Sequence, residues 1–170
     1  MPNAERETIE NLIRILNCHE CVKVFKQKRS FIFNFAMIWN LFEDRCMGNF
    51  ARISEVNNFI ESLISIDNLE VNAIFDYFKD RYKVVDNIYN IESLLWRSNE
   101  NTYRDFVIEK FRNTQCSHQD KIQAVLYIIF RLRNNLFHGE KDIAIINEQK
   151  RTFVLVNKFL MDLIVLKVNR

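Results

Sequence analysis

Glycine and proline are almost absent from this chain of 170 residues. Gly48, Gly139 and Pro2 are the whole set. Because β-sheet proteins of this size use many more of both residues in their turns, the shortage argues against a sheet architecture. The composition therefore predicts an all-α fold. The length predicts one domain over residues 1–170, large enough to bury a hydrophobic core.

Other features that the sequence lacks limit its setting. The first thirty residues are charged and contain no continuous apolar core, so we expect no secretory signal peptide. The most hydrophobic segment, 31–42, contains Asn34 and Asn40 and is too short to cross a bilayer, so no membrane partner is expected. Four cysteines without a secretion signal indicate reduced thiols in a cytoplasm. The formal charge of +2 does not by itself indicate nucleic-acid binding.

Helical periodicity can be followed along most of the chain. It predicts a bundle of about six or seven helices with the long ones at its centre. The expected ranges are 4–16 with 20–28 as its continuation, then 30–47, 55–66, 69–84, 102–113, 119–138 and 148–167. We expect Gly48 to end the helix at 30–47 and Ser54 to cap the helix at 55–66. The Asn- and Ser-rich segment 86–101 is interpreted as a connection that holds a short helix around 94–96.

The most informative stretch is 133–141, which reads RNNLFHGEK and closes an apolar helix beside one of the two glycines. Just before and within it, four polar residues at spacing i, i+3, i+4, i+7 form one predicted stripe: Arg131, Asn134, Asn135 and His138. Asparagine is a poor helix former, so two in succession suggest a reason beyond solubility. Arg133 lies five residues before His138, about 140° around a regular helix. Its long side chain, or a second subunit, could bring the two groups together.

This stretch resembles the signature of the HEPN superfamily, in which an arginine is followed four to six residues later by a histidine. Asparagine often comes directly after the arginine, and Arg133-Asn134-x-x-x-His138 has this form. A random order of 13 arginines, 20 asparagines and three histidines would give it about 0.03 times per chain. HEPN domains are compact helical bundles that dimerise, and many are metal-independent endoribonucleases of toxin–antitoxin and phage-defence systems.

The resemblance implies roles for particular residues and several partners. Arg133 and His138 would form the catalytic pair, and Asn134 would assist them. RNA would be the substrate, and the chain would act as a homodimer, with an antitoxin or defence-system protein as a further partner. Toxins silenced by a nucleotidyltransferase carry a tyrosine two residues after the histidine. This chain has Glu140 there, so we do not expect silencing by that chemistry.

A second point of resemblance lies in the aromatic-rich helix 31–47. Many HEPN sequences carry a tryptophan there and a glutamate one turn later, as Trp39 and Glu43 do here. The two residues share a helix face, and Glu43 could orient an imidazole or pair with an arginine. In the alternative interpretation, Trp39 belongs to the core and Glu43 to the surface.

These residues permit RNA cleavage without a metal or any other cofactor. His138 is suited to take the proton of the ribose 2′-hydroxyl, and Arg133 to stabilise the charge on the phosphorane-like transition state. The expected products are a 2′,3′-cyclic phosphate and a free 5′-hydroxyl. Because the leaving oxygen also needs a proton, a symmetric dimer with both pairs in one cleft is expected. Glu43, Asn135 and Arg131 are the expected auxiliary residues.

Two other sets of residues offer alternatives. The looser Arg-to-His spacing is also met at His19 and His118. Together with Cys18, Cys21 and Cys116, these two histidines could supply zinc ligands, although C-x-x-C opposite C-x-H is not a standard pattern.

Two further interpretations keep the motif but not the catalysis. A non-catalytic HEPN-like dimer would bind RNA or a protein and use Arg133 and His138 to hold phosphate. The 15 phenylalanines supply ample apolar surface for such an interface. In the simplest alternative, both residues only cap a helix end.

Overall fold

The computed structural model describes residues 30–49, 51–63, 66–86, 88–137 and 149–168. Six α-helices lie in this part of the chain: α3 (Ser30–Cys46), α4 (Val56–Glu61), α5 (Asn72–Tyr82), α6 (Asn101–Arg112), α7 (His118–Phe137) and α8 (Lys150–Val168). The short 3-10 helices are η1 (Ile53–Glu55), η2 (Ile66–Asn68), η3 (Glu92–Leu94) and η4 (Ser98–Glu100). The all-α prediction is confirmed. The helices expected at 4–16 and 20–28 lie outside the described residues.

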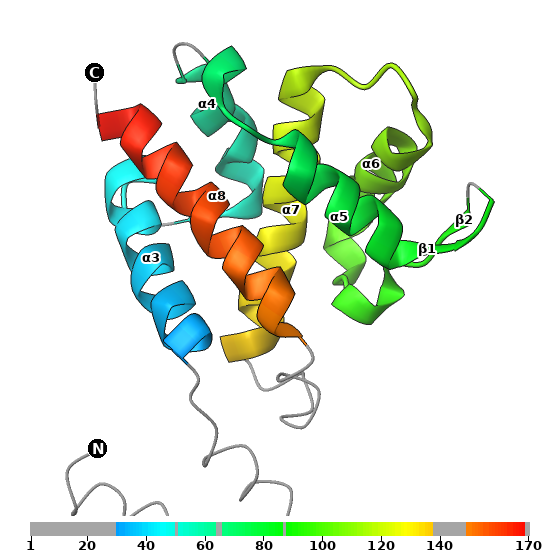
Figure 1. The fold of residues 1–170 in the computed structure, drawn as a ribbon, viewed down its shortest axis with the longest axis horizontal. Helices are drawn as coiled ribbons and strands as arrows, with labels where there is room; N and C mark the ends of the chain where they lie inside the picture. Colours follow the sequence, from blue (N-terminus) through cyan, green and yellow to red (C-terminus); the bar gives the residue numbers. More distant parts are fainter. Residues whose placement is uncertain (1–29, 50, 64–65, 87, 138–148, 169–170) are drawn as a thin grey trace, which may run out of the picture.

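Helix α7 lies at the centre of the bundle (Figure 1). Helices α3 and α8 pack side by side next to it, while α5 and α6 contact α7 from the other side and α4 covers one end (Figure 1). Contact between Phe31 and Phe153 joins the first turns of α3 and α8, which therefore run in the same direction. Among the described residues, no helix is long and apolar enough to cross a membrane.

The central position of α7 follows from its sequence. Ile122, Val125, Leu126, Ile129 and Leu132 lie along one side of α7 and are buried, and Leu136 on the same side is partly buried. Ala124, Tyr127, Ile128 and Phe130 on other sides are buried as well. A helix that is apolar on nearly every side must be enclosed by its neighbours.

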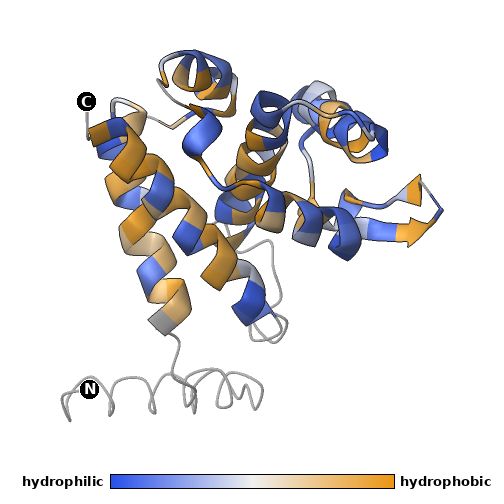
Figure 2. Ribbon diagram, turned by 45° about the horizontal axis from the view of Figure 1, so that its top comes forward, coloured by the Kyte–Doolittle hydropathy of each residue, from blue (hydrophilic) through white to orange (hydrophobic). Residues whose placement is uncertain are grey.

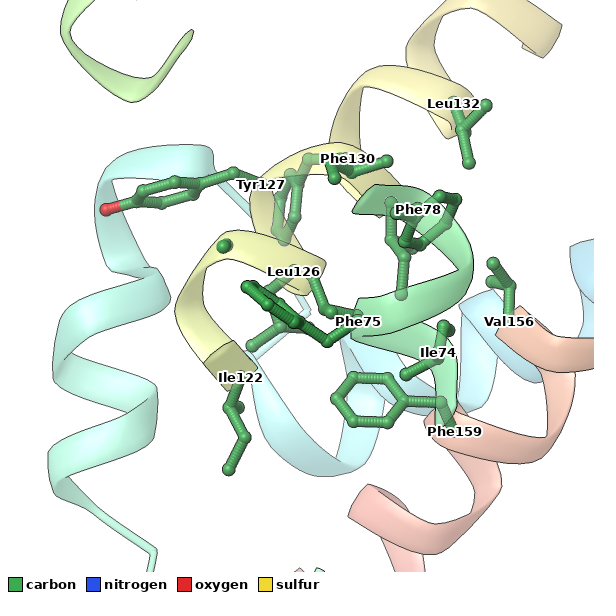
Figure 3. Packing of buried hydrophobic residues seen from close by; sticks show 14 of the residues in the cluster. Ile74, Phe75, Phe78, Ile122, Leu126, Tyr127, Phe130, Leu132, Val156 and Phe159 are labelled. Carbon is green, nitrogen blue, oxygen red and sulfur yellow. The ribbon is translucent and has the colours of Figure 1, made fainter. Parts of the chain in front are cut away.

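The neighbours of α7 supply aromatic and branched side chains to the core. Figure 3 shows Ile74, Phe75 and Phe78 of α5 beside side chains of α7 and α8. The periodicity of the sequence predicts that Ile74, Phe75, Phe78 and Tyr82 face inward, and all four are buried. The hydrophobic contacts of α5 with α7 and α8 hold three helices together around one core.

Helix α5 begins at Asn72 and ends at Tyr82, so it is shorter than the expected 69–84, and two other features also differ from expectation. Helix α4 is much shorter than the expected 55–66, and Ser54 lies inside η1 instead of capping α4, whose N-cap is Glu55. A small antiparallel hairpin, β1 (Lys83–Val85) with β2 (Ile88–Tyr89), was not expected. Its Tyr89 hydroxyl donates a hydrogen bond to the Phe111 carbonyl at 3.1 Å, which ties the hairpin to α6.

Gly48 ends α3 as expected. Its φ is +62°, in the left-handed region, and Asn49 after it has a φ of +68°. This reversal lets the Asn49 amide donate a hydrogen bond to the Glu43 carbonyl at 2.9 Å. Glycine adopts this conformation without the steric cost that other residues carry.

We expect Gly48→Ala to lower the free energy of unfolding by about 1 kcal/mol, measured by urea denaturation followed by circular dichroism. The cost is conformational, because a Cβ at this position would meet nothing within 4 Å. Gly48→Asn is the matched variant and should lose less, since asparagine tolerates positive φ. Equal stability of wild type and Gly48→Ala would contradict this account of the helix end.

Candidate functional site

Arg133, near the end of α7, lies where α7 meets α3. Its guanidinium carbon is 5.7 Å from the centre of the Trp39 ring and 5.6 Å from that of the Phe137 ring. Nη1 donates a hydrogen bond to Asn134 Oδ1 at 3.1 Å, and Nη2 lies 3.7 Å from Glu43 Oε1. The structure thus brings together three of the predicted site residues from two helices.

Trp39 and Glu43 share a face of α3, as their spacing predicted. The Trp39 ring is buried and meets the Phe130 ring edge-on, with centroids 5.0 Å apart. Glu43, one turn later, forms the ion pair with Arg133. The expectation that Glu43 pairs with an arginine is confirmed, and Trp39 is at the same time a core residue.

The Arg133 guanidinium still has hydrogen-bonding capacity. Its Nε is buried and has no hydrogen-bond partner among the described residues. The 3.7 Å separation from Glu43 is too long for a direct hydrogen bond. Because two aromatic rings hold the group while 29% of the side chain stays exposed, it is a fixed, accessible cation with donors to spare. Such a group is well suited to bind a phosphate oxygen.

Arg131 and Asn135 form a separate group. Arg131 is fully buried, and its Nη1 lies 3.0 Å from Glu100 Oε2. Its Nε donates to the Leu94 carbonyl at 3.2 Å, and its Nη2 donates to the Leu95 carbonyl and to Asn135 Oδ1. Asn135 Nδ2 also donates to the Leu94 carbonyl, at 2.7 Å.

The expectation of one polar stripe is therefore corrected. Arg131 and Asn135 bind the segment 92–100, whereas Asn134 bonds to Arg133 on the α3 side. The spacing placed these side chains close together on the helix, but two different neighbours divide them. The backbone at Leu95 is left-handed, with φ of +49°. Because this irregular turn offers its carbonyl groups no regular backbone hydrogen bonds, the polar side chains of α7 donate hydrogen bonds to them instead.

We expect Arg131→Ala to lower the free energy of unfolding by about 3–5 kcal/mol, because it leaves the Glu100 carboxylate buried without its partner. Urea denaturation measures the loss. The matched control is Arg52→Ala at an exposed position, which should change stability by less than about 0.5 kcal/mol. A similarly small change for Arg131→Ala would refute its structural role.

His138, the predicted base, lies outside the described residues, as do Gly139, Glu140 and Lys141. It follows Phe137 directly in the sequence, and the Phe137 ring covers Arg133. Five of the six predicted site residues are therefore described, and three of these form one group around Arg133.

The zinc alternative gains no support from the described part of the chain, in which no three potential ligands cluster. Cys18, His19 and Cys21 lie outside it. His118 Nε2 is 3.0 Å from the Ile66 carbonyl oxygen, a contact that ties the start of α7 to η2.

The two described cysteines are free thiols. Burial raises the pKa of Cys46 to about 11. Burial, and secondarily the carboxylate of Asp120, also raise the pKa of Cys116. Because the thiolate is the reactive form, neither thiol has the character of a nucleophile at neutral pH.

Comparisons of the chain with known protein families, with curated proteins and with solved structures give no significant match. The likeness to HEPN domains therefore stands on the residues of 133–138 and 39–43.

Sequence reasoning missed Glu100, the partner of Arg131, because 31 positions separate the two residues and no periodicity relates them. It also missed a group of polar residues on α5. Asp76, Asp80, Tyr77 and Arg81 show the i, i+4 spacing of one helix face, and that face lies opposite the apolar one. This spacing can be read from the sequence, but the sequence does not show which element packs beside this face of α5.

Proposed function

We propose that this protein is a HEPN-type endoribonuclease that cleaves RNA without a metal ion, acting in the cytoplasm as a toxin or phage-defence effector. The observation that supports this proposal most directly is the state of Arg133. It is held between two aromatic rings, next to Asn134 and Glu43, with an unused buried donor, and His138 follows within five residues.

In the proposed reaction, His138 takes the proton of the ribose 2′-hydroxyl. The oxygen attacks the adjacent phosphorus, the bond to the 5′-oxygen breaks, and the products are a 2′,3′-cyclic phosphate and a 5′-hydroxyl. Arg133 binds the non-bridging oxygens, where its planar fork stabilises the additional negative charge. Asn134 Oδ1 accepts a hydrogen bond from Arg133 Nη1 and leaves the donors on Nε and Nη2 for other partners.

Glu43 has a positioning role in this scheme. Its carboxylate lies close enough to attract the guanidinium but too far to saturate its donors. A phosphate can therefore replace this long-range attraction with direct hydrogen bonds. Phosphate binding is therefore favourable, and in the free protein Glu43 still restrains the Arg133 side chain.

A homodimer supplies the second proton-transfer group that the leaving oxygen requires. The outer faces of α3 and α8 carry exposed apolar side chains that would suit an interface with a second copy. They are Phe33, Met37, Leu41, Val154, Met161, Val165 and Val168. Figure 2 shows both helices coloured as hydrophobic along much of their length.

The test is cleavage of an end-labelled single-stranded RNA by the purified protein in excess chelator. We expect cleavage by wild type and a loss of at least about 100-fold in Arg133→Ala and in His138→Ala, the range of general-base catalysis. Arg112→Ala and His118→Ala are matched controls, since they remove the same residue types from a second place where an arginine precedes a histidine at the looser spacing. Circular dichroism verifies that each variant is folded.

Several outcomes would contradict the proposal. Undiminished cleavage by His138→Ala would eliminate the proposed base, and loss of activity in chelator would indicate a metal-dependent nuclease. RNA binding without turnover would favour the second candidate function, a dimeric HEPN-like binding module, for which the same exposed apolar faces are the supporting observation.

A further inference from the structure

An open groove of about 620 Å³ lies between α5 and the first turn of α8. Its lining residues are Ala73, Asp76, Tyr77, Asp80, Arg81 and Arg151. Five of the six come from α5, at the i, i+3 and i+4 spacings of one face, and Arg151 stands opposite them on α8. The size lies within the range of small-ligand sites.

Contacts around Tyr77 fix the shape of this groove. The Tyr77 hydroxyl and the Thr152 hydroxyl share a 2.6 Å hydrogen bond, which joins α5 to the first turn of α8. The guanidinium carbon of Arg151 lies 5.2 Å from the centre of the Tyr77 ring, and Arg81 Nη1 is 3.4 Å from the Tyr77 hydroxyl. Both arginines are therefore arranged around one half-buried tyrosine.

Within the described residues, the two arginines of the groove contact tyrosine side chains. The structure gives no ion pair to Arg81, Arg151, Asp76 or Asp80 in the ranges it describes. Moreover, α8 begins with Lys150 and Arg151 and has no acidic residue in its first turn. The helix dipole disfavours positive charge at the N-terminus of a helix, so Lys150 and Arg151 do not stabilise α8 through their charge. Two guanidinium groups that form no ion pair within the described residues attract an anion.

A second hollow of about 440 Å³ continues from the first. Its lining residues are Arg81, Tyr82, Lys83, Val84, Asn90 and Ser93. Because Arg81 borders both hollows, a chain of phosphates could pass along Arg151, Arg81 and Lys83. This arrangement suits a polymer better than an isolated ion.

We propose that this groove binds a nucleotide of single-stranded RNA. Its phosphate lies between Arg81 and Arg151, and Asp76 or Asp80 accepts a hydrogen bond from the exocyclic amino group of the base. Carboxylates recognise such amino groups, and unstacked bases of single strands expose them. This role accounts for acidic side chains in a site for a polyanion. The inference rests on the proposed function in taking RNA as the ligand.

The last turn of α7, which follows Arg133, and the first turn of α8, which borders the groove, lie at the same end of the bundle (Figure 1). A series of ring contacts connects them: Phe137, which covers Arg133, stacks on Phe35 at 6.4 Å, and Phe35 meets Phe153 at 5.1 Å. Phe153 is adjacent to Thr152, which bonds to Tyr77 in the groove.

The first test measures binding of a fluorescent single-stranded RNA in which all 2′-hydroxyls are methylated, so that cleavage cannot occur. We expect Arg151→Ala and Arg81→Ala each to weaken binding about fivefold to tenfold, and each lost phosphate contact to reduce the slope of log K against log salt concentration by about 0.7. Arg52→Ala removes the same charge from an exposed position outside the groove and should change binding less than about twofold. Wild-type affinity and slope in both groove variants would overturn the inference.

The second test concerns the base. Wild type should bind oligo(C) or oligo(A) about tenfold more tightly than oligo(U), which has no amino group, and the double variant Asp76→Asn with Asp80→Asn should reduce this preference. Equal tightening for all three polymers in the double variant would mean that the carboxylates only repel phosphate, and would overturn the assignment. Binding of cytidine monophosphate as tight as that of the oligomer would assign the groove to free nucleotides instead of RNA.

The same variants are assayed for cleavage of unmodified RNA, which separates the two proposals. Binding that depends on Arg81 and Arg151 without any turnover supports the groove and contradicts the nuclease. Turnover with unchanged binding in the groove variants supports the nuclease and contradicts the groove. If the folded wild type binds no RNA, both are refuted.

Discussion

A fully buried guanidinium needs both a counter-charge and acceptors for its donors, and Arg131 places this requirement at the centre of the fold. The surrounding helix α7 is enclosed by apolar neighbours, so no water shell can meet the need. The carboxylate of Glu100 and the carbonyls of Leu94 and Leu95 meet it instead. These contacts hold the irregular segment 92–100 against α7, and they fix the rotation of α7 about its own axis. Two positions further on, Arg133 is turned toward α3 as a result.

The surroundings of Arg133 restrain its side chain but leave its charge largely uncompensated. Aromatic rings of Trp39 and Phe137 limit its motion without neutralising its charge, and Glu43 attracts it from beyond hydrogen-bonding distance. A cation so held is restrained before a ligand arrives, which lowers the entropy that binding would cost. The contrast with Arg131 separates a charge that maintains the fold from one that is available for chemistry.

The sequence predicted well where periodicity is long. The ranges of α6, α7 and α8, the inward face of α5 and the end of α3 at Gly48 agree with the structure to within one or two residues. It failed where the outcome depends on a distant partner. The polar stripe that begins at Arg131 was expected to serve one site, but Arg131 and Asn135 are buried against the segment 92–100. Spacing reports which side chains share a helix face, but it does not report what covers that face. The hairpin at 83–89 is short, and its pairing is too local to appear in a helical period. The pairing of Glu43 with an arginine could be foreseen because Trp39 fixed its face of α3.

The proximity of Arg131 and Arg133 has a consequence for genetics. Under the proposed function, loss of either side chain gives the same phenotype in a screen that scores only inactivity. Arg133→Ala removes a reacting group, whereas Arg131→Ala destabilises the fold, and a cell removes a protein that no longer folds. Only the amount of protein that accumulates would tell them apart: scarce for one substitution, abundant for the other. Under the proposed function, two arginines separated by a single leucine therefore report on different properties of the chain, its persistence in the cell and its reactivity.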